Sequence, residues 1–318
     1  MSSLKKFVVF LLVLIILIPV SVFSYLYYKL NSVYDKGEES NTVVTETNFK
    51  KHQGIKNILL VGVDTSNKES VSRSDAMMIL TIDSNKKILK LTSLARDTYV
   101  KIPGHGEEKL THAYAYGGIN LLLETVENNF ELDIQDYVVV DFKSFMSLLD
   151  VIGGISIDVK NSELKELNYF ITETYYLGNY DKRGSIKYIN SSGTQTLNAY
   201  QTLAYARIRK NDSAFGRDER QRSILQATLN KVSSLSISKY PELLDSILPY
   251  VKTDMSPSNI LSLGAKILSM GNLNIEQLEF PILDYSKQGI YGNAGWVIRF
   301  DKDKCLPILH NFIFNDSE

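Results

Sequence analysis

The stretch that decides the fold is Asn57–Ser93, with the sequence NILLVGVDTSNKESVSRSDAMMILTIDSNKKILKLTS. It contains three short apolar runs, at Asn57–Asp64, Ala76–Ile82 and Ile88–Ser93. Continuous apolar runs of this length are typical of strands that are buried in a sheet. A turn at Asp83–Lys86 separates the second run from the third, so we expect the three strands to pair as a meander.

Charged residues flank these strands where a meander would bring them together. In a meander, the end of the first strand, the start of the second and the end of the third lie at one end of the sheet. The residues at those places are Asp64, then Arg73 and Asp75, and finally Arg96 and Asp97. Charges often flank strands without forming a site, but ligands also commonly bind at strand ends. Three converging clusters favour a binding site here.

The rest of the chain alternates strand-like and helix-like segments. Further strands are predicted at 137–141, 155–159, 278–282 and 296–300, the last two as edge strands. Helices are predicted at 119–130, 142–151, 196–205, 223–235, 240–251 and 257–270, with a short helix at the C-terminus. Residues 163–192 are rich in Tyr, Asn and Gly, which indicates a loop-bearing insertion. The alternation predicts an α/β fold, and residues 55–318 contain no linker, which favours one domain.

A second stretch, Arg207–Leu225 (RIRKNDSAFGRDERQRSIL), concentrates arginine in a chain of net charge −1. Its side chains fall into two groups, one with the spacing of an extended strand and one with the spacing of a helical face. The first group is Arg207 and Arg209, and the second is Arg217, Arg220 and Gln221. A strand-like arm and a helical arm would close on one anion from two sides, and a guanidinium group can bind two phosphate oxygens at once. A solvated basic face is the simpler alternative.

These arginines and the acidic residues at the strand ends suit phosphoryl transfer. That reaction needs positioning, a divalent cation and positive groups near the developing charge. Asp64 and Asp75 are hard oxygen ligands of the kind that Mg²⁺ takes together with substrate phosphates. Asp97 is either a general base for an incoming hydroxyl or a residue that only orients Arg96. The groups expected at a diphosphate are Arg73, Arg96, Arg207, Arg209 and Arg217, with Gln221 orienting an oxygen.

The composition argues against several other functions. The chain has 318 residues, one cysteine and four scattered histidines. A single cysteine excludes an internal disulfide and a thiolate metal cluster, and we expect Cys305 to be a plain buried thiol. The scattered histidines argue against a zinc site or a histidine-based triad. A net charge near zero argues against a nucleic-acid partner.

The N-terminus predicts a membrane anchor. Lys5 and Lys6 precede a long apolar run, and Tyr25, Tyr27 and Tyr28 suit an aromatic belt at the far interface. A cleaved signal peptide is the alternative, but no small-x-small cleavage site follows the run.

We therefore expect a single-pass protein of the cell membrane, with a cytoplasmic segment at 1–6 and a transmembrane signal anchor at 7–28. A polar extracytoplasmic tether at 29–54 would lead to an extracytoplasmic domain at 55–318. An amino-acid composition rich in Lys, Ile and Asn, together with the lack of disulfides, is compatible with the surface of a Gram-positive bacterium.

Five short motifs occur along the chain in a fixed order. They are GVD at Gly62–Asp64, SRSDAM at Ser72–Met77, SLARDTYVKIPG at Ser93–Gly104, KLTHAYAYGG at Lys109–Gly118, and RIR…GRDERQ in the arginine stretch. Together they resemble the LytR-CpsA-Psr family of cell-wall phosphotransferases, and the resemblance covers almost the whole chain. The usual third motif has proline before the Arg-Asp pair, whereas this chain has Ala95 and retains the charged pair.

The resemblance implies a fold, a reaction and a set of roles. The family fold is an α/β/α sandwich around a mixed central sheet, with an apolar pocket for a prenyl chain. The family reaction moves a glycopolymer, such as teichoic acid or capsule, from a polyprenyl-diphosphate carrier to peptidoglycan through a phosphodiester link, releasing polyprenyl phosphate. By motif position, Asp64 and Asp75 would associate with Mg²⁺ or Mn²⁺, and Asp75, Arg96 and Asp97 would be catalytic. The implied diphosphate-binding set is Arg73, Arg96, Lys109, Arg207, Arg209, Arg217 and Gln221.

Two other functions fit the same residues. A hydrolase would cleave the same polyprenyl diphosphate with water in place of the acceptor hydroxyl. A non-catalytic protein would bind the lipid-linked glycan, or regulate its use, without transferring it.

Overall fold

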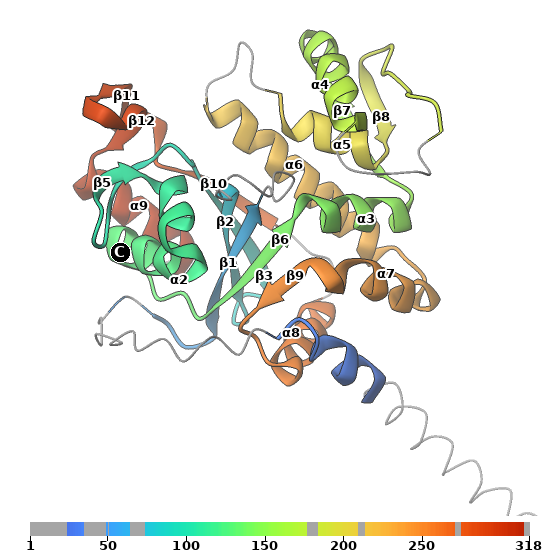
Figure 1. Ribbon diagram of the computed structural model, residues 1–318. Helices are drawn as coiled ribbons and strands as arrows, with labels where there is room; N and C mark the ends of the chain where they lie inside the picture. Colours follow the sequence, from blue (N-terminus) through green and yellow to red (C-terminus); the bar gives the residue numbers. More distant parts are fainter. Residues whose placement is uncertain are drawn as a thin grey trace, which may run out of the picture.

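A mixed six-stranded sheet forms the centre of the protein (Figure 1). The computed structural model describes residues 24–34, 49, 51–63, 74–176, 184–208, 214–270 and 275–314. The strand order in the sheet is β10-β3-β2-β1-β6-β9. The strands are β1 (Ile55–Val63), β2 (Ser74–Asp83), β3 (Ile88–Leu94), β6 (Asp136–Asp141), β9 (Val251–Thr253) and β10 (Ile275–Phe280). The predicted α/β class with a mixed central sheet is confirmed.

The first three strands pair as the predicted meander. β1 and β2 are antiparallel, with Gly62 opposite Ala76, and β2 and β3 are antiparallel, with Met78 opposite Ser93. β6 and β10 add to this meander in parallel, beside β1 and β3 respectively. The start of β2 therefore lies next to the ends of β1 and β3.

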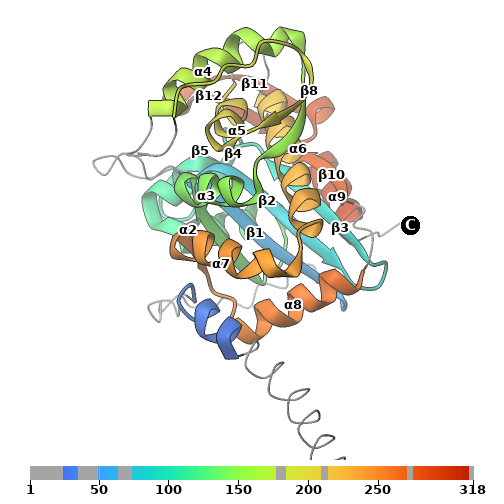
Figure 2. The same ribbon diagram turned by 90° about the vertical axis from the view of Figure 1, so that its right-hand side faces the viewer.

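Helices cover both faces of the sheet (Figures 1 and 2). Side chains alternate between the faces along each strand, so Leu59 and Val61 point to one face and Ile58 and Leu60 to the other. The first face packs against α2 (Leu110–Phe130) and α9 (Lys302–Phe314). The second packs against α8 (Pro257–Ser269) at one end, and α3 (Phe142–Ile152), α6 (Ala214–Ser233) and α7 (Tyr240–Ile247) lie across the rest of it (Figure 2).

A second hydrophobic cluster lies beyond α3 and α6. It is built from α3 and α6 together with α4 (Leu164–Tyr176), α5 (Ala199–Ala206) and the antiparallel pair β7 (Ile155–Val159) and β8 (Gly193–Leu197). Residues 164–176 are thus helical, where we expected a loop-bearing insertion. The glycine pair before β7 forms a turn as expected, since Gly154 has φ +83° and a Cβ there would lie 2.4 Å from the Leu197 carbonyl oxygen.

The remaining elements are short. Two small hairpins are β4 (Tyr99–Ile102) with β5 (Gly106–Lys109), and β11 (Ser286–Tyr291) with β12 (Gly295–Phe300). The strand predicted at 296–300 therefore belongs to a hairpin and not to the edge of the central sheet, whereas β10 is an edge strand as predicted. The single-turn helices are η1 (Asn161–Glu163), η2 (Ile237–Lys239), η3 (Leu248–Tyr250), η4 (Leu283–Tyr285) and η5 (Gly292–Ala294). Cys305 is fully buried in α9, and burial raises the pKa of its thiol.

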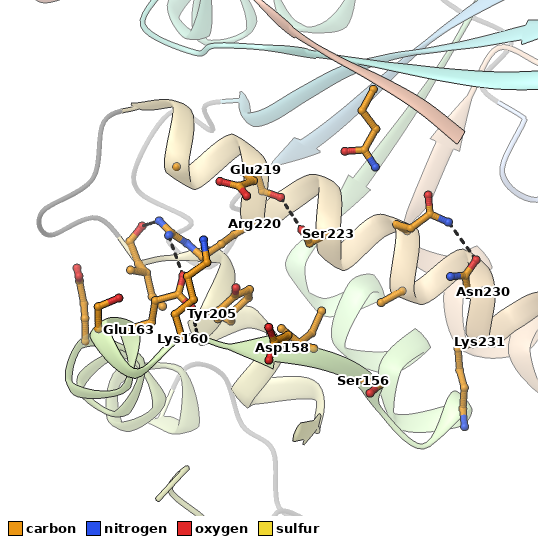
Figure 3. Close-up of a pocket in the computed structure, with 18 of the residues that line it drawn as sticks. Ser156, Asp158, Lys160, Glu163, Tyr205, Glu219, Arg220, Ser223, Asn230 and Lys231 are labelled. Atoms are coloured by element: carbon orange, nitrogen blue, oxygen red, sulfur yellow. Dashed lines mark hydrogen bonds and ion pairs between the residues drawn. The ribbon is translucent and has the colours of Figure 1, made fainter. Parts of the chain in front are cut away.

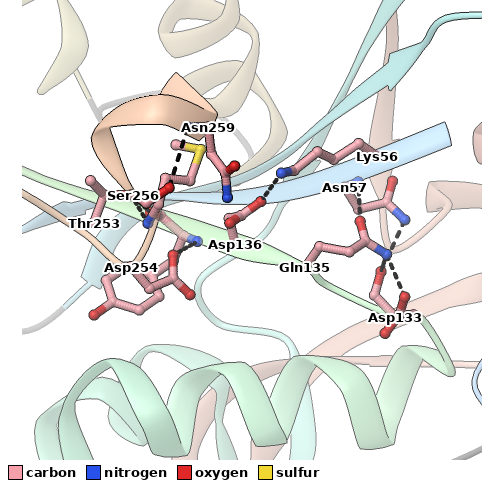
Figure 4. A network of polar contacts seen from close by, with 11 residues as sticks. Lys56, Asn57, Asp133, Gln135, Asp136, Thr253, Asp254, Ser256 and Asn259 are labelled. Atoms are coloured by element: carbon pink, nitrogen blue, oxygen red, sulfur yellow. Dashed lines mark hydrogen bonds and ion pairs between the residues drawn. The ribbon is translucent and has the colours of Figure 1, made fainter. Parts of the chain in front are cut away.

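A polar network fixes the sheet at the end opposite the expected site (Figure 4). The buried Asn57 side chain donates to the Asp133 carbonyl oxygen (3.1 Å) and accepts from Thr81 Oγ1 (2.7 Å). Nearby, the Asp254 carboxylate accepts from the Tyr137 backbone N–H (2.8 Å), and burial raises the pKa of this carboxyl group. Buried polar groups that are all paired hold one strand register, so the opposite strand ends are also fixed in place.

The N-terminal segment packs on the domain. Residues 24–30 are helical, and Leu30 and Val33 are buried against Leu248. Lys29 forms an ion pair with Asp245 (2.7 Å), and the Thr253 N–H donates to the Val33 carbonyl oxygen (3.2 Å). The first residues of the expected tether are therefore docked. Most of the expected anchor at 7–28 lies outside the described residues, and among the helices that are described none is both long and apolar enough to cross a membrane.

Candidate functional site

Five of the charged residues singled out by the sequence meet where β2 begins and β3 ends. Arg96 Nη1 donates to Asp75 Oδ1 at 2.6 Å, and Arg96 Nε lies 3.4 Å from Asp97 Oδ2. Lys109 Nζ lies 3.2 Å from Asp97 Oδ1. Arg217 Nη2 donates to the Asp75 backbone oxygen at 3.0 Å and lies 3.7 Å from Asp75 Oδ1. We call this set the Asp75 network. The convergence expected from the meander is confirmed for Asp75 and Arg96.

The start of α2 holds the backbone of this network. The first N–H groups of a helix have no partner within the helix. Here the Leu110 N–H donates to the Thr98 carbonyl oxygen and the Thr111 N–H to the Arg96 carbonyl oxygen. Thr111 Oγ1 also donates to the Ser74 carbonyl oxygen at 2.8 Å. Thr111 thereby ties α2 to β2 beside Asp75, a role that its place in KLTHAYAYGG did not indicate.

The arginines of α6 anchor this helix at three points. Each reaches a different element, namely Asp75 of β2, Glu163 of η1 and Glu279 of β10. The contacts are Arg217 to Asp75, Arg220 Nη1 to Glu163 Oε1 (3.3 Å) and Arg222 Nη2 to Glu279 Oε2 (3.7 Å). All three arginines are buried. Much of the basic cluster therefore fixes the helix, and among its described residues only Arg217 belongs to the Asp75 network.

The prediction of a strand-like arm is wrong for Arg207. This residue caps the C-terminus of α5 with φ −97° and ψ −5°, which is a helical conformation. Its Nη2 lies 3.9 Å from Glu173 Oε2, and its guanidinium group lies 5.8 Å from the centre of the Phe170 ring. Arg207 thus contacts α4. The predicted site residues Asp64, Arg73 and Arg209 lie outside the described residues.

An apolar cavity of about 290 Å³ borders the Asp75 network. It lies between the sheet and helices α3, α5 and α6. Its walls include Leu60, Met78, Val138, Leu148, Leu203 and Leu225. Ala76, which follows Asp75, and Gln221, one turn after Arg217, also line it. A diphosphate bound by Arg96 and Arg217 would therefore have an apolar space beside it. The sequence did not reveal this cavity, because apolar residues that line a cavity resemble those that pack together.

The described residues offer a limited set of metal ligands. Among them, no three carboxylate, histidine or cysteine side chains gather to hold a metal ion. Asp97 is occupied by Arg96 and Lys109. Asp75, partly exposed at the end of β2, meets Arg96 and Arg217 through the same carboxylate oxygen, Oδ1, whereas both oxygens of Asp97 face a cation. A magnesium ion that is bound mainly by substrate phosphates needs only one or two protein carboxylates, so Asp75 fits such an ion.

A comparison with models of protein families identifies the family of this chain. The model of the LytR_cpsA_psr family matches residues 20–305. The chain belongs to the LytR-CpsA-Psr family. The resemblance drawn from the five sequence motifs is thereby confirmed.

Characterised relatives of this LytR-CpsA-Psr protein share both its sequence and its fold. It is 31% identical over 299 residues to the polyisoprenyl-teichoic acid–peptidoglycan teichoic acid transferase TagT of Bacillus subtilis (strain 168), covering 90% of this chain and 88% of TagT. A structure of TagT bound to LI-WTA superposes with a TM-score of 0.66 at 26% identity, covering 88% of this chain and 98% of that one. A structure of YwtF (TagT) with bound octaprenyl pyrophosphate lipid gives a TM-score of 0.61 at 26% identity, with the same coverage.

The ion pair between Arg220 and Glu163 gives a test of the anchoring role. Glu163→Gln removes the charge that compensates a buried guanidinium, and breaking such a pair costs about 3 kcal/mol. We expect this loss in the free energy of unfolding, measured by urea denaturation of the full chain. In an Arg220→Met background no buried guanidinium remains opposite Glu163, so the same change should cost less than about 1 kcal/mol. An equal cost in both backgrounds would show that the pair does not hold α6.

Proposed function

We propose that this protein transfers a glycopolymer from a polyprenyl-diphosphate carrier to peptidoglycan. The observation that carries the proposal is the position of the Asp75 network at one side of the apolar cavity. This arrangement suits a ligand with a diphosphate head and a hydrocarbon tail. TagT is named as a transferase of teichoic acid from a polyisoprenyl carrier to peptidoglycan, and it has been solved with a prenyl pyrophosphate.

In the proposed reaction an acceptor hydroxyl oxygen bonds to the phosphorus that carries the glycan. The bond from that phosphorus to the bridging oxygen of the diphosphate breaks, and polyprenyl phosphate leaves with the electron pair. The hydroxyl proton passes to solvent or to a nearby base. Arg96 and Arg217 would stabilise the negative charge on the phosphate oxygens, which is the main contribution a protein makes to this class of reaction.

Asp97 is assigned a positioning role in this proposal. Its two carboxylate oxygens face Lys109 Nζ and Arg96 Nε, so both are engaged by cations. A carboxylate held in this way orients the two cations toward the diphosphate. Of the two roles left open by the sequence, the ion pairs support orientation of Arg96.

A magnesium ion would complete the charge balance at the diphosphate. Asp75 is the described residue that would hold it, together with phosphate oxygens of the substrate. When bound, the ion would supply positive charge to the phosphate oxygens. Asp75 would then exchange part of its contact with Arg96 for the metal, which would free the guanidinium group for the substrate.

We further propose that residues 7–28 anchor the protein in the cell membrane, with the family domain outside the cell. Two observations support a location beside the bilayer. Leu30 and Val33, which come directly after the proposed anchor, are buried against Leu248, and Ile247 and Val251 join this cluster. Ile247 and Val251 also line the apolar cavity. One wall of the cavity thus adjoins the segment that would emerge from the membrane, which is where a prenyl carrier would reside.

The transferase activity can be tested with the full chain in detergent micelles. The reaction would contain a synthetic polyprenyl-diphosphate glycan, a soluble peptidoglycan oligosaccharide and Mg²⁺, with products identified by mass spectrometry. We expect glycan joined to the acceptor through one phosphate. Arg217→Ala should lower the rate by about 100-fold, as removal of one charge-stabilising donor does elsewhere. Arg299→Ala, on hairpin strand β12, is the matched control and should leave the rate unchanged.

Two outcomes of this experiment would contradict the proposal. Free glycan phosphate as the sole product, even with abundant acceptor, would identify a hydrolase. Binding of the donor with no product at all would identify a non-catalytic lipid-linked glycan-binding protein.

The proposed role of Asp75 predicts that removing the metal reverses which protein, the wild type or Asp75→Asn, binds pyrophosphate more tightly. Without a divalent cation, the Asp75 carboxylate competes with phosphate for Arg96, so Asp75→Asn should bind inorganic pyrophosphate about tenfold more tightly than the wild type. With Mg²⁺ the order should reverse, because the variant loses the metal ligand. Isothermal titration calorimetry with and without Mg²⁺ would measure both affinities. The same order under both conditions would argue against metal binding by Asp75.

A further inference from the structure

A second, larger cleft of about 850 Å³ lies on the other side of α6 (Figure 3). One wall is α6, with Glu219, Ser223, Asn230 and Lys231 labelled in the figure. The other wall is β7 and η1, which contribute Ser156, Asp158 and Glu163. The ion pair between Arg220 and Glu163 closes one end of the cleft above Tyr205. Burial, with the negative charge of Glu163 adding to it, raises the pKa of the Tyr205 phenol, so that group stays a neutral hydroxyl.

The chemistry of this cleft is polar and close to neutral. Four carboxylates and three cations line it, and one carboxylate is already paired with Arg220. The carboxylates are Asp158, Glu163, Glu166 and Glu219, and the cations are Lys160, Arg220 and Lys231. Hydroxyl and amide side chains make up most of the remainder. A polyanion would meet a slight excess of negative charge here, whereas an uncharged chain of hydroxyl groups would meet several hydrogen-bond donors and acceptors beside apolar surface.

Two amide side chains on α6 suit an acetamido group. Gln226 Nε2 donates to Asn230 Oδ1 at 3.0 Å, and both residues line the cleft. An amide pair joined in this way presents an acceptor oxygen on one side chain and donor hydrogens on the other. An acetamido substituent on a sugar has one N–H donor and one carbonyl acceptor, so it needs one acceptor and one donor from the protein. Ser223 lies on the same face of the helix, nearer than Gln226 to the helix end that carries Arg217.

The two faces of α6 separate this polar cleft from the apolar cavity. Gln221, Ile224, Leu225 and Thr228, at helical spacing, face the cavity. The cleft is lined instead by Gly216, Glu219, Arg220, Ser223, Gln226 and Asn230. Gly216 lines the cleft and the next residue, Arg217, belongs to the Asp75 network, so both features share the N-terminal end of α6. Phosphoryl transfer proceeds with the attacking and leaving oxygens roughly in line, so acceptor and lipid should approach from different sides.

We propose that this cleft binds the acceptor, as an uncharged glycan chain of N-acetylated amino sugars. The inference rests on the proposed transferase function and extends it, because it assigns the acceptor to one side of α6 and the lipid to the other. The near-neutral lining favours the peptidoglycan strand over a phosphate-rich donor polymer. An acceptor hydroxyl at the Gly216 end of the cleft would lie next to Arg217.

The test introduces a bulky side chain into the cleft at an exposed position, so that no buried residue changes. Ser223 is exposed on α6 inside the cleft, and Ser233 is exposed on the same helix but does not line it. We expect Ser223→Trp in the full chain to weaken binding of a soluble peptidoglycan oligosaccharide without stem peptides, its lactyl carboxyl groups capped as amides to keep it uncharged, by at least about tenfold. The KM for this acceptor should rise by a similar factor. The KM for the lipid donor and the affinity for pyrophosphate should stay unchanged. Ser233→Trp should behave as the wild type.

The outcomes separate this proposal from the transferase assignment. Unchanged oligosaccharide binding and unchanged acceptor KM in Ser223→Trp would overturn the acceptor cleft. Loss of binding of a polyol-phosphate polymer, with oligosaccharide binding intact, would also overturn it and assign the cleft to the donor. If the wild type transfers no glycan but its oligosaccharide binding still depends on Ser223, the cleft proposal stands and the transferase assignment fails.

Discussion

The contact between β2 and α6 through Asp75 sets the geometry on which the rest of the structure depends. Arg217 of α6 donates to the backbone oxygen of Asp75, and Arg96 at the end of β3 donates to its carboxylate. Hydrogen bonds to charged groups contribute roughly 1.5–3 kcal/mol each, which is enough to hold the start of a helix against a sheet. The same groups would meet a substrate anion. Structural support and chemistry therefore share one set of side chains, and a ligand would have to compete with existing ion pairs.

Helix α6 acts as a partition because it is anchored on several sides. Arg220 and Arg222 fix it to η1 and β10, and its apolar residues contact the second hydrophobic cluster. One face is then free to border an apolar cavity and another a polar cleft. A reaction that joins a lipid-linked donor to a polar acceptor needs two such compartments with a charged site between them. The order of cavity, Asp75 network and cleft around one helix satisfies that need with a single element.

Local patterns in the sequence predicted the strands and one part of the site. The apolar runs of β1, β2 and β3 fixed their pairing as a meander, and this pairing brings Asp75 to Arg96. The helix predicted at 196–205 corresponds to α5, whose start is capped by the Asn198 side chain, which accepts from the Gln201 N–H. These features depend on neighbours in the chain or on one simple topology.

Other features depended on distant partners and could not be predicted. Arg220 shares a helical face with Arg217 by spacing, but its partner Glu163 lies far away in sequence and draws it to the other side of the helix. The helix α2 begins at Leu110, earlier than expected, because Gly117 and Gly118 only kink it. Helix α4 was missed because it lies in the stretch 163–192, which is rich in Tyr, Asn and Gly and therefore typical of loops. Burial of Leu167 and Ile171 in the second cluster stabilises it.

A structure of the full chain with a polyprenyl diphosphate and Mg²⁺ would test the central claim most directly. The account predicts the prenyl chain in the apolar cavity against Leu225 and Leu148, and the diphosphate between Arg96 and Arg217. The metal ion would lie on Asp75, and the polar cleft would hold no lipid. A prenyl chain in the polar cleft, or a diphosphate away from Arg217, would contradict the assignment of the two sides of α6.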